Sequence, residues 1–235
     1  MLGILIQIAL SWLLIRIVEH ESLSVLGYQP IRKRILQLLV GFSLAAIVCG
    51  IAQLIESNLT GVSWQVNKAF DFRLFFEGVW WNLKSVLFEE FIFRGALLYI
   101  AIKRLGTRAG LALSAASFGI YHWFSYGIIG SPVAMVLVFV VTGLIGLVWA
   151  YSFSATGSMA LPVGLHFGWN YVLNSIFSKG PIGIQFLVPL EPENYSQLSG
   201  IPWILNFILP AVIFAFLSYK LASRMSKVHI SPEKP

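Results

Sequence analysis

Charged residues are scarce in this chain of 235 residues: Asp, Glu, Lys and Arg together make up 11%, whereas hydrophobic residues make up 57%. The mean hydropathy is +0.80. These values exclude an ordinary soluble domain, in which about a quarter of the residues are charged. Cysteine occurs once, as Cys49 in an apolar run, so an internal disulfide framework is excluded and packing is its expected role. The composition predicts a polytopic membrane protein.

Apolar runs predict about seven transmembrane helices, because a helix needs about 20 mainly apolar residues to cross the hydrocarbon of a bilayer. The first run lacks a positively charged start and no small-residue cleavage site follows it, so we expect an anchor rather than a signal peptide. We expect the connection 179–200 to be a plain loop. The predicted fold is an all-α transmembrane helix bundle that forms a single domain over 1–235. The seven runs lie at residues 2–18, 35–56, 74–102, 109–126, 132–151, 157–178 and 201–222.

The positions of the sixteen Lys and Arg residues predict the orientation. With the basic loop at 32–34 in the cytoplasm, seven crossings put eleven basic residues on that side and only Lys68, Arg73 and Lys179 in the opposite loops. The positive-inside rule therefore favours a cytoplasmic C-terminus. The net charge of +6 is explained by basic loops beside anionic lipid headgroups, so no nucleic acid is expected as a partner.

Ionisable side chains interrupt three of the predicted helices. Glu89, Glu90 and Arg94 lie in the third, His122 in the fourth and His166 in the sixth. Such groups are costly in a bilayer, and they indicate a functional site. At a rise of about 1.5 Å per residue, the three helices bring these groups to a similar depth.

The spacing of these residues predicts different roles for the two glutamates. Glu90 and Arg94 are four residues apart and can pair on one helix face, whereas Glu89 is rotated by about 100°. A carboxylate without a partner in a low-dielectric pocket can deprotonate water beside a neutral imidazole, so Glu89 is the predicted general base. His166 and Asn170 also share a face, and they can act as two donors that hold a developing oxyanion.

His122 would complete the water site from a third helix, but each of these groups also has a structural interpretation. The acidic pair can serve only to neutralise Arg94 and Lys84. A single histidine in a bundle more often hydrogen-bonds a neighbouring helix, and Asn170 alone would join two helices. The joint occurrence of these groups favours a functional site. Both histidines of the predicted helices are expected at the depth of the buried acids, and the other two histidines of the chain lie outside the predicted helices.

Three short motifs carry a resemblance to a known family. Residues 89–94, EEFIFR, resemble the EExxxR motif of the CPBP (Abi) family, which comprises the type II CAAX prenyl endoproteases and their bacterial relatives. Residues 118–122, FGIYH, match its FxxxH motif, and residues 166–170, HFGWN, match its HxxxN motif. All three occur in the family's order within the motif core 85–175. The resemblance implies an α-helical intramembrane endopeptidase with a catalytic cavity that opens toward membrane and cytosol.

The resemblance also implies roles by position. Glu89 would be the base, His122 would hold or share the water, and His166 with Asn170 would be the oxyanion donors. The implied site residues are Glu89, Glu90, His122, His166 and Asn170, with Arg94 in support.

The sequence leaves open whether a metal ion takes part in the reaction. Two His and one Glu form a known catalytic zinc set, which Glu89, His122 and His166 could supply, and the family has been called metalloproteases on that ground. If Glu89 is a ligand and Glu90 is paired with Arg94, no base remains for the bound water. We therefore favour glutamate-activated water without a metal, with Zn²⁺ as the alternative cofactor.

The expected substrate is a protein or peptide in or at the membrane. Cleavage would occur either behind a prenylated C-terminal cysteine or in processing of the bacteriocin type. The short chain and the lack of an organelle signal favour a bacterial plasma membrane. Two other classes stay open: a catalytically idle immunity or scaffold protein that binds a partner, and a transporter that uses Glu89 and the histidines as a proton relay. Paired Gly/Pro interruptions, typical of transporters, are not found.

Overall fold

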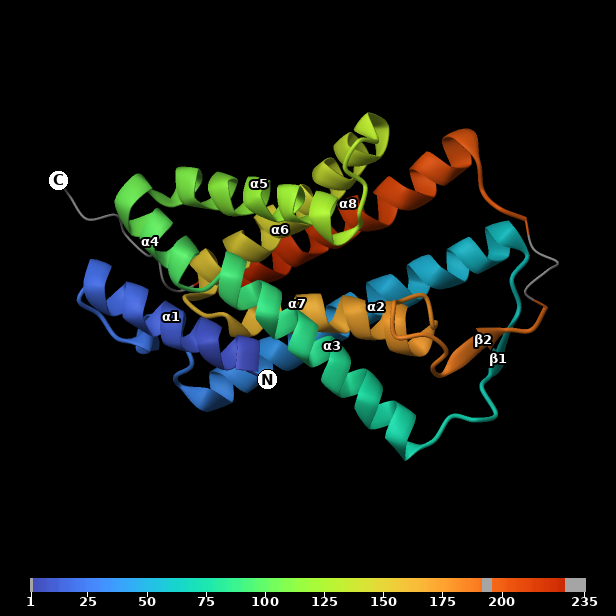
Figure 1. Ribbon diagram of the computed structural model, residues 1–235, viewed down its shortest axis with the longest axis horizontal. Coiled ribbons are helices and arrows are strands. Elements are labelled where there is room, and N and C mark those ends of the chain that lie inside the picture. Colours follow the sequence, from blue (N-terminus) through green and yellow to red (C-terminus); the bar gives the residue numbers. More distant parts are fainter. Residues whose placement is uncertain (1, 192–195, 227–235) are drawn as a thin grey trace.

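The computed structural model describes residues 2–191 and 196–226, which form one elongated bundle of helices (Figure 1). The all-α prediction is confirmed. In addition to the α-helices, a short 3-10 turn, η1 (Leu23–Leu26), follows α1, and a π-helical turn, η2 (Val172–Ile176), continues α7. The α-helices are α1 (Leu2–Val18), α2 (Ile31–Thr60), α3 (Phe72–Phe93), α4 (Ala96–Leu105), α5 (Thr107–Ser125), α6 (Pro132–Thr156), α7 (Ala160–Tyr171) and α8 (Gly200–Met225).

The third predicted helix, 74–102, is wrong as a single helix, because the chain breaks between α3 and α4. Arg94 leaves the helical conformation with φ −124° and ψ 4°. Gly95 follows, and a Cβ atom there would collide with the carbonyl oxygen of Phe91. The break therefore depends on glycine, and it begins at Arg94, the last residue of the EEFIFR motif.

The connection 179–200 is more than a plain loop, because it contains a strand. Strand β2 (Leu187–Pro189) pairs antiparallel with β1 (Trp64–Val66), and Trp64 lies opposite Pro189. Strands of three residues are too short to show an alternating pattern, so sequence periodicity could not predict them. The pair lies at the end of the bundle where α2 ends and α8 begins (Figure 1). Residues 192–195 lie outside the described part of this connection.

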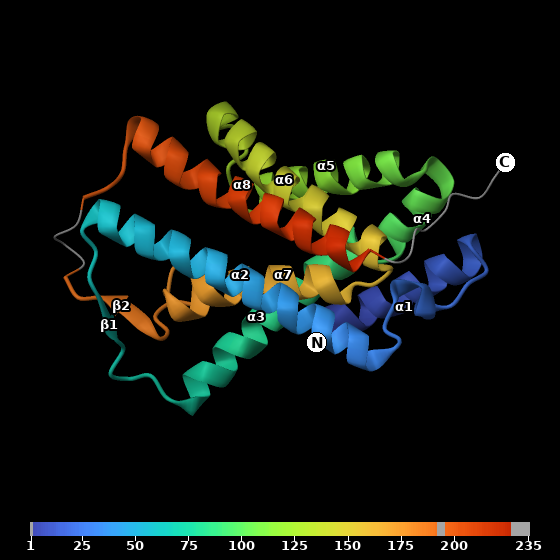
Figure 2. The same ribbon diagram turned by 180° about the vertical axis from the view of Figure 1, so that it is seen from behind.

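Helix α7 occupies the centre of the bundle and packs closely along α2 (Figure 2). Small residues make this approach possible. A Cβ atom on Gly164 would collide with the carbonyl oxygen of Leu38, and one on Gly168 would collide with that of Phe42. Small residues at helix interfaces let backbones approach in membrane proteins. Because α7 carries His166 and Asn170, this contact fixes half of the candidate site.

Three helical segments among the described residues are long and apolar enough to cross a membrane: Leu23–Thr60, which contains α2, and then α6 and α8. Helix α1 is apolar but shorter. The chain is therefore an integral membrane protein. Helix α4, with 10 residues, is only about 15 Å long and cannot cross alone. The seven crossings and the side of the C-terminus stay predictions.

An ion-pair cluster joins the end of α1 to the end of α4. The Nε of Arg104 donates to Oε1 of Glu19 at 2.9 Å, and the Nζ of Lys103 lies 3.4 Å from Oε2 of the same carboxylate. Burial opposes the ionisation of Glu19, but the hydrogen bonds and charges of Arg104 and Lys103 outweigh it and lower the pKa of Glu19. This cluster stabilises the packing of the two helix ends.

Candidate active site

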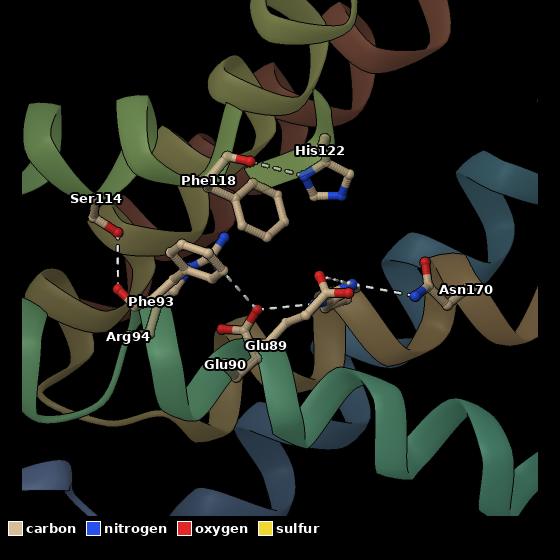
Figure 3. Close-up of polar contacts among 9 residues, drawn as sticks. Glu89, Glu90, Phe93, Arg94, Ser114, Phe118, His122 and Asn170 are labelled. Carbon is tan, nitrogen blue, oxygen red and sulfur yellow. Dashed lines mark hydrogen bonds and ion pairs between the residues drawn. The ribbon is translucent and has the colours of Figure 1, made fainter. Parts of the chain in front are cut away.

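The motif residues converge from three helices in the middle of the bundle. Glu89 and Glu90 come from the last turns of α3, His122 from the end of α5, and Asn170 from α7 (Figure 3). His166 lies on α7 one turn before Asn170. Within the described residues, His166 contacts Glu89, Glu90 and Asn170, whereas His122 forms no hydrogen bond or ion pair with these four side chains.

Glu90 lies at the hub of this network and is fully buried. Its Oε1 is 2.9 Å from Nδ1 of His166 and 3.4 Å from Nη1 of Arg94. The predicted pair of Glu90 and Arg94 is confirmed. The contact with His166 crosses from α3 to α7, so spacing along one helix could not reveal it.

Arg94 is also fully buried, and aromatic rings surround its charge. Its Cζ lies 4.2 Å from the ring centroid of Phe118 and 5.1 Å from that of Trp149. None of its guanidinium nitrogens has a hydrogen-bond partner among the described side chains and backbone. The charge of Arg94 is therefore balanced by Glu90 and by the faces of the rings.

His166 is held on three sides. Its Nδ1–H donates to Glu90, its ring stacks on Trp149 with centroids 4.1 Å apart, and its Nε2 lies 3.2 Å from Nδ2 of Asn170. With Nδ1 protonated, a neutral imidazole presents a lone pair at Nε2, which accepts from the Asn170 amide. Neutral His166 is thus an acceptor at the site, and it becomes a donor there only when both ring nitrogens carry protons.

His122 is oriented by its own helix. Its Nδ1 lies 2.8 Å from the carbonyl oxygen of Phe118, one turn earlier, and the ring packs edge to face against Phe118. The side chain is buried. Because the carbonyl fixes the proton on Nδ1, the Nε2 atom of His122 is an acceptor that can hold a water molecule.

Glu89 is the carboxylate of the cluster that lines a cavity, and it shares with Glu90 a buried Oε2 atom without a hydrogen-bond partner among the described residues. The Oε2 of Glu89 lies 3.8 Å from Nε2 of His166. The prediction that Glu89 lacks the partner that Glu90 has agrees with this geometry. Buried polar atoms without partners are rare in proteins, and each one calls for a ligand or a function.

Two cavities flank the cluster. One, of about 290 Å³, is lined by Glu89 and by Tyr121, the neighbour of His122. The other, of about 730 Å³, lies between α2, α6 and α8, and its wall includes Trp169, the neighbour of Asn170, and Tyr126, which packs on His122.

The arrangement does not form a metal site. Residue types such as those of Glu89, His122 and His166 suit zinc. Across residues 2–191 and 196–226, however, no three His, Cys, Asp or Glu side chains lie close enough together to hold a metal ion.

Sequence reasoning missed the part played by Trp149, which contacts both His166 and Arg94. A tryptophan inside an apolar run is expected to pack against lipid or neighbouring helices, so its sequence context carried no signal. Ser114 was missed as well. Its hydroxyl donates to the carbonyl oxygen of Phe93 at 2.8 Å, which satisfies the backbone where α3 ends.

Comparison with protein families matches residues 71–172 to the family described as Rce1-like, type II CAAX prenyl endopeptidase. The matched segment begins at Asp71, which caps α3, and ends directly after α7. It therefore contains every helix that contributes a candidate site residue. No curated protein and no solved structure matches the chain.

Proposed function

Since the chain belongs, through residues 71–172, to the type II CAAX prenyl endopeptidase Rce1-like family, we propose that it is an intramembrane endopeptidase in which Glu89 activates water. Its substrate is a protein or peptide in or at the membrane. The observation that carries this proposal is the buried, unpartnered Oε2 of Glu89 in a cavity wall, 3.8 Å from an imidazole nitrogen. An ionisable group at such a place in a membrane protein is expected to serve a function.

The first step is the addition of water to the peptide carbonyl. A water molecule held by Nε2 of His122 gives one proton to the Glu89 carboxylate, and its oxygen bonds to the carbonyl carbon. The carbonyl oxygen becomes an oxyanion. The second N–H of the Asn170 amide donates to it, and so does Nε2–H of His166 when that imidazole carries two protons.

The second step breaks the bond between the carbonyl carbon and the amide nitrogen. The oxyanion collapses to a carbonyl, and the leaving nitrogen takes the proton that Glu89 received from water. The products are a new C-terminus and a new N-terminus. Glu89 returns to the carboxylate form, so the cycle is balanced without a further reactant.

Glu90 and Arg94 act as positioning residues in this mechanism. The Glu90 carboxylate, 2.9 Å from Nδ1, fixes the orientation of His166 and stabilises an imidazolium when one forms. Arg94 balances the charge of Glu90 inside the protein. We further propose a bacterial plasma membrane as the location, with the C-terminus in the cytoplasm as the basic loops predict.

The experiment compares protein termini by mass spectrometry in membranes of cells that make the wild type, E89Q or E77Q at equal levels. Glu77 is a matched control, because it lies on the same helix but is exposed, and among the described residues its ion pair is with Arg73. We expect new termini with the wild type and with E77Q, and none with E89Q. Equal termini in all three and in cells without the protein would favour an idle immunity or scaffold protein. New termini that persist in E89Q would refute Glu89 as the base.

A further inference from the structure

A third cavity, of about 370 Å³, lies on the opposite side of α3 from Glu89. Leu87 and Phe91 of α3 line it, and each is two residues from Glu89, so both side chains point about 160° away from that carboxylate. Helices α1, α2 and α7 and the turn η1 form most of the remaining wall. Cavities of about 300–1,000 Å³ are large enough for a small-molecule ligand. The third cavity is therefore a candidate binding site separate from the residues proposed for catalysis.

Arg34 is the charged residue in the wall of the third cavity. Its Nε donates to the carbonyl oxygen of Gln29 at 2.9 Å, and its Nη1 donates to Oε1 of Gln37 at 3.0 Å and to the carbonyl oxygen of Thr156 at 3.2 Å. A guanidinium has five N–H donors, and the two on Nη2 have no acceptor among the described residues. The guanidinium is therefore held in place, and it retains donors for an anion.

The rest of the wall is mainly apolar, and its backbone groups are paired where η1 meets the start of α7. The hydroxyl of Ser158 donates to the carbonyl oxygen of Gly27 at 2.6 Å, and the N–H of Met159 donates to that of Leu26 at 3.1 Å. A peptide in this cavity would leave its own N–H and C=O groups without partners, which is costly in apolar surroundings. A hydrocarbon chain has no such groups. The wall therefore favours a ligand with a long apolar part and one anionic group.

The position of Arg34 along α2 matches the depth of lipid headgroups. It lies in the first turn of this long apolar helix, next to Arg32 and Lys33, and none of the three forms an ion pair with a carboxylate of the described residues. Basic pockets between transmembrane helices at this depth bind anionic headgroups. We propose that the third cavity binds an anionic phospholipid, whose phosphate accepts hydrogen bonds from Arg34 and whose acyl chain lies between α1, α2, α3 and α7.

The bound lipid stabilises the packing of α3 on α7. Leu87 and Phe91 of α3 and Val163 of α7 belong to one hydrophobic cluster, and all three line the third cavity. A ligand that binds only the folded state raises the free energy of unfolding. An anionic phospholipid should therefore raise the Tm of the protein. This inference does not depend on the proposed function, because lipid binding and Tm are measured without a substrate.

The test offers phosphatidylglycerol and phosphatidylcholine with the same acyl chains, in competition, to purified full-length protein, and native mass spectrometry counts the bound lipids. We expect the wild type to retain phosphatidylglycerol in preference by about fivefold or more, because the choline cation opposes Arg34. Its Tm should be higher in nanodiscs that contain phosphatidylglycerol. R34Q should lose the preference and R34K should keep it. K33Q, the matched control, removes the same charge from the same turn but outside the cavity wall, and it should behave as the wild type.

Equal retention of the two lipids by the wild type would overturn the proposal, and this comparison needs no variant to fold. A preference that survives in R34Q would also overturn it, and so would an equal loss in R34Q and K33Q, because the effect would then come from the general surface charge. A dimer that persists without bound lipid would contradict the proposal as well, since a second copy of the chain would then cover the cavity.

Discussion

Two neighbouring glutamates of α3 lie in opposite environments. Glu90 is fully buried and contacts both Arg94 and His166, whereas Glu89 lines a cavity and lies 3.8 Å from His166. Successive helical residues point about 100° apart, so one dipeptide serves both the interior and the cavity. The comparison teaches that a buried acid in a membrane helix is not catalytic by its presence alone. Its partners decide whether it supports the fold or the reaction.

The largest expected effect concerns Glu89, the glutamate that lines the cavity. E89Q should lower the cleavage rate by about 100- to 10,000-fold, because it removes the general base. Rates measured with purified protein and the identified substrate check this, and E77Q is the matched control on the same helix. Near-normal activity of E89Q would show that another group takes the proton.

The second prediction concerns Glu90, the glutamate in the protein interior. E90Q should destabilise the protein by about 3–5 kcal/mol, because Arg94 would remain buried without its counter-charge. Denaturant or thermal unfolding in detergent measures the loss.

Replacing both partners sharpens this result. The double variant E90Q/R94M should be more stable than E90Q alone, since it removes the isolated charge. Its activity should stay low, because His166 has lost its carboxylate partner. Strictly additive losses of stability would contradict the assigned pair.

A smaller effect is expected at Trp149, whose ring contacts both His166 and the guanidinium of Arg94. W149L removes the ring that stacks on His166 and lies beside the Arg94 charge, so it should cost about 1–2 kcal/mol of stability. It should also lower kcat through misplacement of His166. The control is W203L, at a tryptophan that is 43% exposed. Equal effects of the two substitutions would argue against a specific role for Trp149.

The smallest expected effect concerns pH and lies away from the site. The pKa of Glu19 is lowered in the folded protein by Arg104 and Lys103. Its contribution to stability is therefore present above the unfolded pKa and is lost as the pH falls through the folded pKa. The difference in Tm between the wild type and E19Q should be largest near neutral pH and shrink under acidic conditions. A constant difference across that range would contradict this assignment.

Contacts within one helix were predictable, and contacts between helices were not. Spacing of four residues indicated the pairs Glu90–Arg94 and His166–Asn170, and both are in contact. The bond from Glu90 to His166 depends on how α3 and α7 pack, which no pattern along either helix specifies.

The break between α3 and α4 shows the same limit. Gly95 and Arg94 lie within a long apolar run, and hydrophobic periodicity does not register a single residue that leaves the helix. Phe118 and Trp149, whose rings lie beside the Arg94 guanidinium, belong to two further helices. Hydrophobic periodicity along one helix could not predict these contacts either.

The most direct test of the contrast between the two glutamates is thermal unfolding of E89Q and E90Q side by side with the wild type, together with cleavage of one substrate. The account predicts that E89Q loses cleavage with a Tm close to that of the wild type, whereas E90Q loses Tm as well. An equal fall of Tm in both variants, or a fall only in E89Q, would contradict it.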